Sequence, residues 1–156
     1  MIKRILAALV IALNLAFADQ VVKELAVANL KNSPPVKVID GFFALAYVEN
    51  RGCAWGMMQG QVWPLAVFAL AVLAILVWKH KEVFGSGVAV PGLLYAGIAG
   101  NLIDRVFRGH VVDMFDFRFG AWHFPCFNVA DSLICIAVAL MVFNEARSVY
   151  SRRTHR

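Results

Sequence analysis

The chain has 156 residues, of which 61% are hydrophobic and only 16% are charged, and its formal net charge is +5 at pH 7. This composition excludes an ordinary soluble domain and indicates that a lipid bilayer is the solvent. A helix needs about 20 apolar residues to cross a hydrocarbon core roughly 30 Å thick. Four segments approach that length: residues 5–22, 62–78, 88–106 and 127–143.

The basic residues outside these four segments are unevenly distributed. The N-terminal end, the connection containing Lys79 and Lys81, and the C-terminal tail together hold eight Lys and Arg residues and two acids, whereas the rest of the chain holds seven basic residues and eight acids. Because cytoplasmic loops are enriched in Lys and Arg, both termini are expected in the cytoplasm and residues 28–61 and 108–126 outside. The positive charge therefore indicates topology, and nucleic-acid binding is not expected.

Residues 5–22 have a second interpretation. A basic start, an apolar run and the small residues Ala16 and Ala18 also fit a cleavable signal peptide. Against this, apolar character continues to Lys23, and Asp19 and Lys23 are spaced four residues apart on one helical face. We therefore expect a retained helix.

Both outer segments are predicted to contain extended structure. Two β-prone runs, residues 36–39 and 42–48, are joined by Asp40-Gly41, a pair typical of a tight hairpin turn. Aromatic and charged residues alternate over residues 115–119, which also favours a strand. The expected fold is a membrane all-α bundle of four transmembrane helices with a small extracytoplasmic β-rich cap, forming one domain over residues 1–156.

Polar side chains interrupt the third and fourth apolar segments. Asn101, Asp104 and Arg105 fall on one helical face because of their i, i+3, i+4 spacing. Asp131 lies about one turn inside the fourth segment. Charged side chains are costly in lipid and usually face a bundle interior or a functional site. An ion pair between Asp104 and Arg105 that only stabilises the bundle is the alternative for those two residues.

Asp113 and Asp131 are candidates for a catalytic pair. Two carboxylates near the same interface can share one proton, because like charges a few ångströms apart cannot both ionise. Such a pair can activate water and protonate a departing amine, which hydrolyses an amide without a metal. Asp131 could instead only cap its helix with Asn128. A solvated loop acid is the alternative for Asp113 and the expected role of Asp116.

Other kinds of site are weakly indicated. The histidines form no HExxH motif, and no Ser or Cys nucleophile motif occurs, so no metal or cofactor is expected. Cys53, Cys126 and Cys135 show no CxxC spacing and are expected to be free thiols, with a bridge between Cys53 and Cys126 as the alternative. A small ion-coupled transporter would also place acids inside spans, and a structural or assembly protein would need no single Asp.

Five motifs, taken together and in this order, resemble bacterial signal peptidase II. They are Asp19-Gln20-Val21-Val22-Lys23, residues 48–56, Gly100-Asn101-Leu102-Ile103-Asp104-Arg105, Gly109-His110-Val111-Val112-Asp113 and Phe127-Asn128-Val129-Ala130-Asp131-Ser132. The resemblance covers residues 19–143, nearly the whole chain. The sequence departs from the family pattern at Cys53, where the family usually has Ala.

The resemblance implies an aspartic endopeptidase with Asp113 and Asp131 as its catalytic residues. It further implies a set of residues that support the site or bind substrate: Asp19, Lys23, Asn50, Gly52, Asn101, Asp104, Arg105, Asn128 and Ala130. The implied substrate is a diacylglyceryl-modified prolipoprotein, cleaved before its lipid-modified Cys by carboxylate-activated water without a cofactor. The implied location is the bacterial inner membrane, with the active site at the outer leaflet. We expect a monomer whose other partner is membrane lipid.

Overall fold

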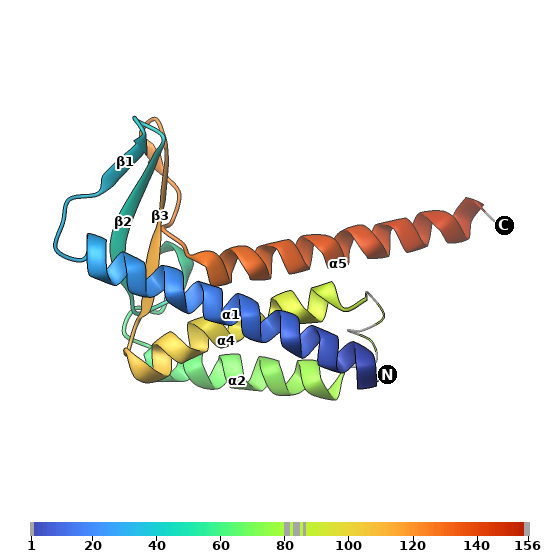
Figure 1. Cartoon of the computed structure of the whole chain (residues 1–156). Helices are drawn as coiled ribbons and strands as arrows, with labels where there is room; N and C mark the ends of the chain where they lie inside the picture. Colours follow the sequence, from blue (N-terminus) through green and yellow to red (C-terminus); the bar gives the residue numbers. More distant parts are fainter. Residues whose placement is uncertain (1, 80–81, 83–84, 86, 155–156) are drawn as a thin grey trace.

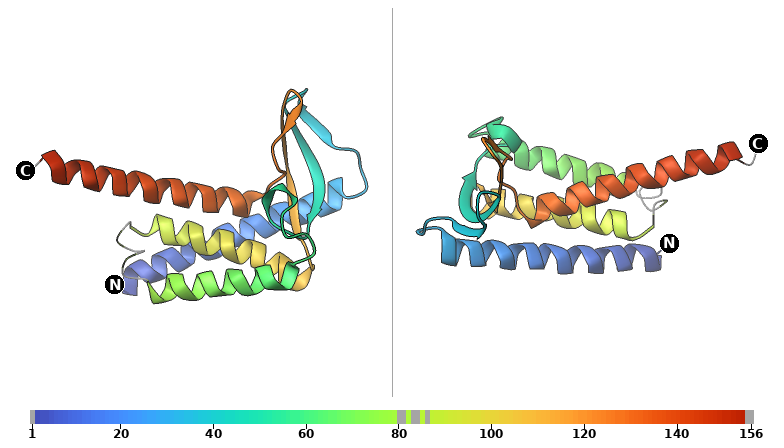
Figure 2. Two further views of the ribbon diagram at one scale, coloured as in Figure 1. Left: turned by 180° about the vertical axis from the view of Figure 1, so that it is seen from behind. Right: turned by 90° about the horizontal axis from the view of Figure 1, so that it is seen from above.

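The computed structural model describes residues 2–79, 82, 85 and 87–154. Its four long helices are α1 (Ile2–Leu30), α2 (Val62–Trp78), α4 (Ala89–Phe107) and α5 (Val129–Thr154). The helices run roughly alongside one another, and a four-stranded sheet stands across one end of them (Figure 1; Figure 2). Helices occupy all four predicted segments, and α1 continues eight residues beyond its predicted end without a break.

The helix surfaces are unusually apolar. Two helical segments, Ile2–Leu30 and Val129–Ser148, are long and apolar enough to cross a membrane, and only 17% of the most apolar window of each is buried. Apolar side chains such as Leu13 and Phe17 are instead more than two-thirds exposed. A soluble protein would bury such residues, so this surface is suited to contact with lipid. Helix α2 carries no charged residue but is shorter, with 17 residues.

Helix α4 packs against α1, α2 and α5 and has most of its polar face buried. Small residues allow this close packing. A Cβ atom on Gly97 would lie 2.5 Å from the carbonyl oxygen of Ala130, and one on Gly92 would lie 2.7 Å from the side chain of Ile11. Glycine at these two positions therefore permits α4 to approach α5 and α1, which brings the polar residues of three helices together.

The sheet contains β1 (Val36–Ile39), β2 (Phe43–Asn50), β3 (Val111–Phe119) and β4 (Trp122–His123), in that order and with antiparallel neighbours. The predicted hairpin between β1 and β2 is confirmed, but Ile39 pairs with Phe43, so its loop has three residues, 40–42, instead of the predicted two. Its turn contains Gly41 at φ 70°, a left-handed conformation that glycine adopts without strain. Strand β3 contains the predicted alternating segment but begins four residues earlier, so Asp113 lies within the sheet.

The helix ends remote from the sheet carry both chain termini and exposed basic residues. The start of α1 and the last turns of α5 lie at the end remote from the sheet (Figure 1). Lys3 and Arg4 are exposed there. Two of the basic residues that predict a cytoplasmic side, Lys81 and Arg156, lie outside the described residues.

Candidate active site

The two candidate catalytic carboxylates come from different elements. Asp113 is the third residue of β3 and is only 1% exposed, whereas Asp131 lies in the first turn of α5 and is half-buried. The chain reverses between them, so that the backbone of Phe127 pairs with Phe115. This pairing holds the start of α5 against β3 and brings Asn128 within reach of Asp113.

Three asparagine side chains orient the carboxylates. Asn50 Nδ2 donates to Asp113 Oδ2 at 3.0 Å, and Asn128 Nδ2 donates to Asp113 Oδ1 at 2.7 Å. Asn101 Nδ2 donates to Asp131 Oδ1, also at 2.7 Å. Because the amides are neutral, they fix the carboxyl groups in place without supplying the positive charge that would force both of them to ionise.

The environment of Asp113 favours its protonated form. Burial, followed by the charge of Asp131, raises the pKa of Asp113 to about 7, against the opposing hydrogen bonds from Asn50 and Asn128 and the charge of Lys23. A carboxyl group that keeps its proton near neutral pH can act as an acid. The predicted helix-capping interaction between Asn128 and Asp131 is also present, and it coexists with these contacts.

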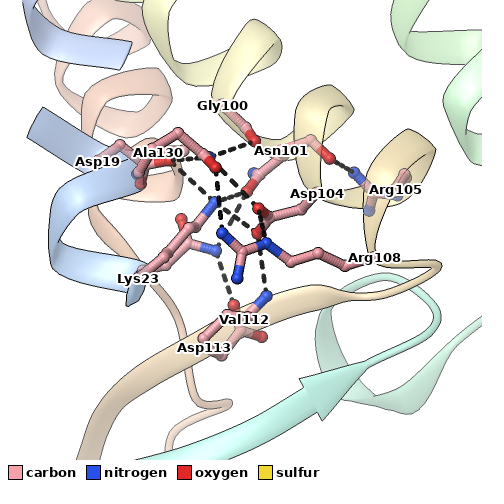
Figure 3. Close-up of polar contacts among 12 residues, drawn as sticks. Asp19, Lys23, Gly100, Asn101, Asp104, Arg105, Arg108, Val112, Asp113 and Ala130 are labelled. Carbon is pink, nitrogen blue, oxygen red and sulfur yellow. Dashed lines mark hydrogen bonds and ion pairs between the residues drawn. The ribbon is translucent and has the colours of Figure 1, made fainter. Parts of the chain in front are cut away.

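A fully buried ion cluster lies next to the carboxylates. Lys23 Nζ is 2.9 Å from Asp19 Oδ2 and 2.9 Å from Asp104 Oδ2, and none of the three side chains has exposed surface (Figure 3). Arg108 adds a second cation, with its Nε 3.1 Å from Asp104 Oδ1. The predicted i, i+4 relation of Asp19 and Lys23 is confirmed.

The alternative of an Asp104–Arg105 ion pair is wrong. Consecutive side chains on a helix point about 100° apart and do not face each other. Arg105 instead donates to two carbonyl oxygens, that of Gly52 at 3.2 Å and that of Asn101 at 3.4 Å. It therefore ties α4 to the segment that follows β2.

The remaining predicted residues join the same hydrogen-bonded set. Ala130 donates its N–H to Asp19 Oδ1 at 2.8 Å, and Gly52 donates its N–H to Asn50 Oδ1 at 2.9 Å. All nine predicted supporting residues thus belong to one network around the two carboxylates: Asp19, Lys23, Asn50, Gly52, Asn101, Asp104, Arg105, Asn128 and Ala130.

Sequence reasoning missed two residues of this network. Gln20 Nε2 lies 3.1 to 3.3 Å from Asp19, the Gly100 carbonyl and Asp104, and so links α1 to α4. Arg108 was recognisable, because it lies four residues after Asp104 on the same helical face. Gln20 carried no comparable signal, since its contacts depend on how two helices pack.

Asp116 is not the solvated acid that the sequence predicted. It is only 8% exposed, and Arg118 contacts its Oδ2 through both Nε at 3.0 Å and Nη2 at 2.7 Å. The two residues lie two apart in β3, so their side chains share a face of the strand. His123 Nδ1 lies 3.5 Å from the other oxygen. Asp116 therefore belongs to a polar cluster on the outer part of the sheet.

Two cavities meet at the carboxylates. One, of about 1010 Å³, lies between α2, α4 and α5; its wall is mostly apolar but includes Asn101, Arg105 and Asp131. The other, of about 490 Å³, lies against the sheet and is lined by polar groups including Asp113 and Asp116. Both cavities share a set of wall residues: Asn50, Cys53, Trp55, Phe124, Pro125 and Cys126. Asp131 therefore lines the first cavity and Asp113 the second.

The cysteines do not form the alternative bridge. Cys53, Cys126 and Cys135 are all free. Burial raises the pKa of Cys126 to about 12, so its thiol stays neutral. Within residues 2–79, 82, 85 and 87–154 there is also no group of three or more His, Cys, Asp or Glu residues placed to hold a metal ion.

Known proteins resemble this chain in both sequence and fold. A family model described as signal peptidase (SPase) II matches residues 11–147. A lipoprotein signal peptidase of Bacillus pumilus is 43% identical, covering 85% of this chain and 87% of that protein, and one of Burkholderia cenocepacia is 40% identical over 74% and 73%. A bacterial membrane enzyme solved by the in meso method at 2.3 Å resolution has a TM-score of 0.81 and 30% identity, covering 91% of this chain and 88% of its own. Since the match takes in both carboxylates and the whole network around them, the chain belongs to the signal peptidase II family.

Proposed function

We propose that this signal peptidase removes the signal peptide from diacylglyceryl-modified prolipoproteins, cleaving before the lipid-modified Cys, with Asp113 and Asp131 as the catalytic residues. One observation carries the proposal. Two carboxyl groups, held by neutral amides, lie where an apolar cavity within the helices meets a polar groove on the sheet. This arrangement provides an acid and a base for amide hydrolysis.

The mechanism uses the two carboxyl groups in different protonation states. Asp131 starts as the carboxylate and takes a proton from a water molecule as the water oxygen attacks the scissile carbonyl carbon. Asp113, whose pKa lies near 7, gives its proton to the carbonyl oxygen. Collapse of the tetrahedral intermediate then breaks the C–N bond, and the departing nitrogen takes a proton from the pair. Activity should fall as the pH rises through the pKa of Asp113, because the pair then loses its shared proton.

The two cavities suit the two parts of this substrate. The membrane-side cavity is lined by apolar residues of three helices, including Leu65, Phe68 and Ile134, and could hold apolar portions of the lipid-modified precursor. The outer groove contains Glu49, Asp116 and Arg118, which suit a polar peptide that leaves the membrane. Acyl chains in the outer leaflet would hold the scissile bond at the junction.

We further propose one integral domain with four transmembrane spans in the bacterial inner membrane. The distribution of Lys and Arg, with α1 beginning and α5 ending at the end remote from the sheet, supports cytoplasmic termini and an extracytoplasmic sheet. The active site would then lie at the outer leaflet. The exposed apolar helix faces suit lipid, so we propose that the enzyme works as a monomer.

The proposal is tested by cleavage of a purified diacylglyceryl-modified prolipoprotein and of the same precursor without lipid. We expect cleavage of the modified form only, at the bond before its Cys. Asp113→Asn and Asp131→Asn should each abolish turnover while the lipid-modified substrate still binds, because neither variant can exchange the proton. Asp40→Asn is the matched control, since Asp40 lies in the exposed hairpin turn. Robust cleavage by either site variant would overturn the mechanism, and equal cleavage of the unmodified precursor would overturn the substrate.

A further inference from the structure

Lys23 is the hub of the polar network. Its ammonium group contacts Asp19 Oδ2 at 2.9 Å, Asp104 Oδ2 at 2.9 Å and Asn101 Oδ1 at 3.0 Å (Figure 3). An ammonium has three N–H donors, so these contacts use all of them. Because the Lys23 side chain has no exposed surface, any effect on substrate passes through these neighbours.

Two of the residues that Lys23 contacts accept hydrogen bonds from backbone N–H groups beside the candidate catalytic aspartates. Asp104 Oδ2 accepts a hydrogen bond from the N–H of Val112 at 3.1 Å, and Asp19 Oδ1 accepts one from the N–H of Ala130 at 2.8 Å. Val112 and Ala130 are the residues immediately before the two candidate catalytic aspartates. A shift of either acid in the cluster would therefore move one catalytic carboxylate by way of a single peptide unit.

The third contact sets the direction of an amide. Asn101 Oδ1 accepts from Lys23 and also from Asn128 Nδ2 at 3.1 Å. Its nitrogen must therefore point the other way, where it donates to Asp131. With the ammonium removed, the amide could turn and present its oxygen to the carboxylate, which would repel it.

We propose that Lys23 is the positioning residue for both halves of the aspartate pair: it holds Val112 through Asp104 and Ala130 through Asp19, and it directs the amide of Asn101. This inference rests on the proposed aspartic mechanism. It assigns Lys23 a role in turnover and gives it no contact with substrate.

The positive charge of Lys23 adds a second effect. It lowers the pKa of Asp113, in opposition to burial and to Asp131. The charged groups around it are Asp19 on α1, Asp104 on α4, Arg108 directly after α4, Asp113 on β3 and Asp131 on α5. Removal of the ammonium should therefore move the loss of activity at high pH to a higher pH.

The test must separate positioning from folding. Lys23→Met alone leaves two buried carboxylates without their shared cation, which is strongly destabilising. The double variant Lys23→Met with Asp19→Asn removes one charge of each sign, and the new amide oxygen can still accept the N–H of Ala130. Lys23→Arg keeps the charge but changes the geometry. Lys37→Met is the matched control, because it makes the same substitution in an exposed ion pair with Asp40, outside the network.

The measurements are kcat, KM, the pH profile and the melting temperature with the lipid-modified substrate. In the folded double variant we expect kcat to fall on the order of 100-fold and KM to change only a few-fold. The loss of activity on the alkaline side of the pH profile should occur at a higher pH than in wild type. Lys23→Arg should lose activity at the same alkaline pH as wild type, but with a reduced kcat. Lys37→Met should keep the melting temperature, kcat and the pH profile near wild type.

A folded double variant with wild-type kcat and pH profile would overturn the inference, as would losses of kcat that merely follow the folded fraction in all variants. If the double variant does not fold, Lys23→Arg decides: wild-type kcat overturns the inference, and reduced kcat at an unchanged melting temperature supports it. Failure of the proposed function looks different, because the wild-type enzyme would then not cleave or Asp113→Asn would remain active.

Discussion

Asn128 and Asp131 cap each other at the start of α5: the N–H of Asp131 donates to Asn128 Oδ1 at 2.9 Å, and the N–H of Asn128 donates to Asp131 Oδ2 at 3.3 Å. Reciprocal capping of this kind satisfies free N–H groups at a helix start. Here the atoms left over have further contacts, because Asn128 Nδ2 donates to Asp113 and Asp131 Oδ1 accepts from Asn101. The cap that starts the helix thus also fixes the distance between two carboxylates.

Asn128→Ser should separate these two roles. A Ser hydroxyl caps a helix about as well as an Asn side chain, but it cannot replace the amide that donates to Asp113. We expect the Ser variant to be more stable than Asn128→Ala, by about 1 kcal/mol, and yet to lose activity on the order of 10-fold or more. Melting temperature and cleavage rate of both variants check this. Full activity of Asn128→Ser would mean that the amide contact is dispensable.

Asp113 should make the stability of the protein depend on pH. Its pKa is near 7 in the folded protein, compared with about 4 in an unfolded chain. The folded state therefore binds the extra proton between these values, and the stabilisation present below pH 4 is lost as the pH rises through 7. Since one pKa unit corresponds to about 1.4 kcal/mol, this loss amounts to up to about 4 kcal/mol.

Asp113→Asn removes the titrating group, and so the stability of the variant relative to wild type should increase from pH 4 to pH 8. Melting temperatures of both proteins in detergent across this range measure the difference. Asp40→Asn, in the exposed turn, is measured beside it to control for the loss of one surface carboxylate. A constant difference between Asp113→Asn and wild type over this range would contradict the prediction.

Asp116→Asn should destabilise the protein, whereas the same substitution of a solvated loop acid should leave the stability unchanged. The variant loses one charge of a two-contact pair with Arg118, and the carboxylate side chain is only 12% exposed. Because Arg118 is 43% exposed, solvent weakens the pair, and we expect destabilisation of up to about 1 kcal/mol. Asp40→Asn serves as the comparison, since both side chains of its pair with Lys37 are at least 75% exposed. Equal melting temperatures for the two variants would contradict the prediction.

Topology is open to a direct measurement. Reporter fusions after Lys31 and after Arg118 should report an extracytoplasmic location, whereas fusions after Lys81 and Arg156 should report the cytoplasm. A mature protein that begins at Asp19 would instead support the cleaved-signal interpretation of the first segment. Such a product would lack the helix that leads up to Asp19 and Lys23.

The sequence predicted the elements of this protein better than the contacts between them. Spacing along one helix or strand was enough to place α2, the hairpin turn and the pair Asp19–Lys23, because each depends on neighbours in the sequence. The bond between Lys23 and Asp104 joins residues 81 positions apart on two helices, and nothing local indicates it. For the same reason the chain alone suggested Arg105 as the partner of Asp104.

The burial of Asp116 was missed for a related reason. Alternation over residues 115–119 correctly indicates a strand, but it cannot tell how the neighbouring chain covers that strand. In the structure the segment after β3 folds back, and His123 of β4 approaches the carboxylate. Charge in an outer segment is therefore a poor guide to exposure where the segment forms a sheet.

Gly100→Ala should damage the site without altering any polar side chain. A Cβ atom at this position would lie 2.5 Å from Asp19 Oδ2 and 3.2 Å from the Cβ of Ala130. Asp19 is packed between Lys23 and the N–H of Ala130, so it can move away only by disturbing one of these contacts. We expect a loss of stability of about 1 to 3 kcal/mol from overpacking together with a fall in kcat that exceeds the loss of folded protein. Gly85→Ala is the control, because among the described residues no atom beyond its chain neighbours lies within 4 Å of its new methyl group, and its melting temperature and cleavage rate should stay close to wild type. Full activity and stability of Gly100→Ala would show that Asp19 can shift without consequence and that its contact with Ala130 does not position Asp131.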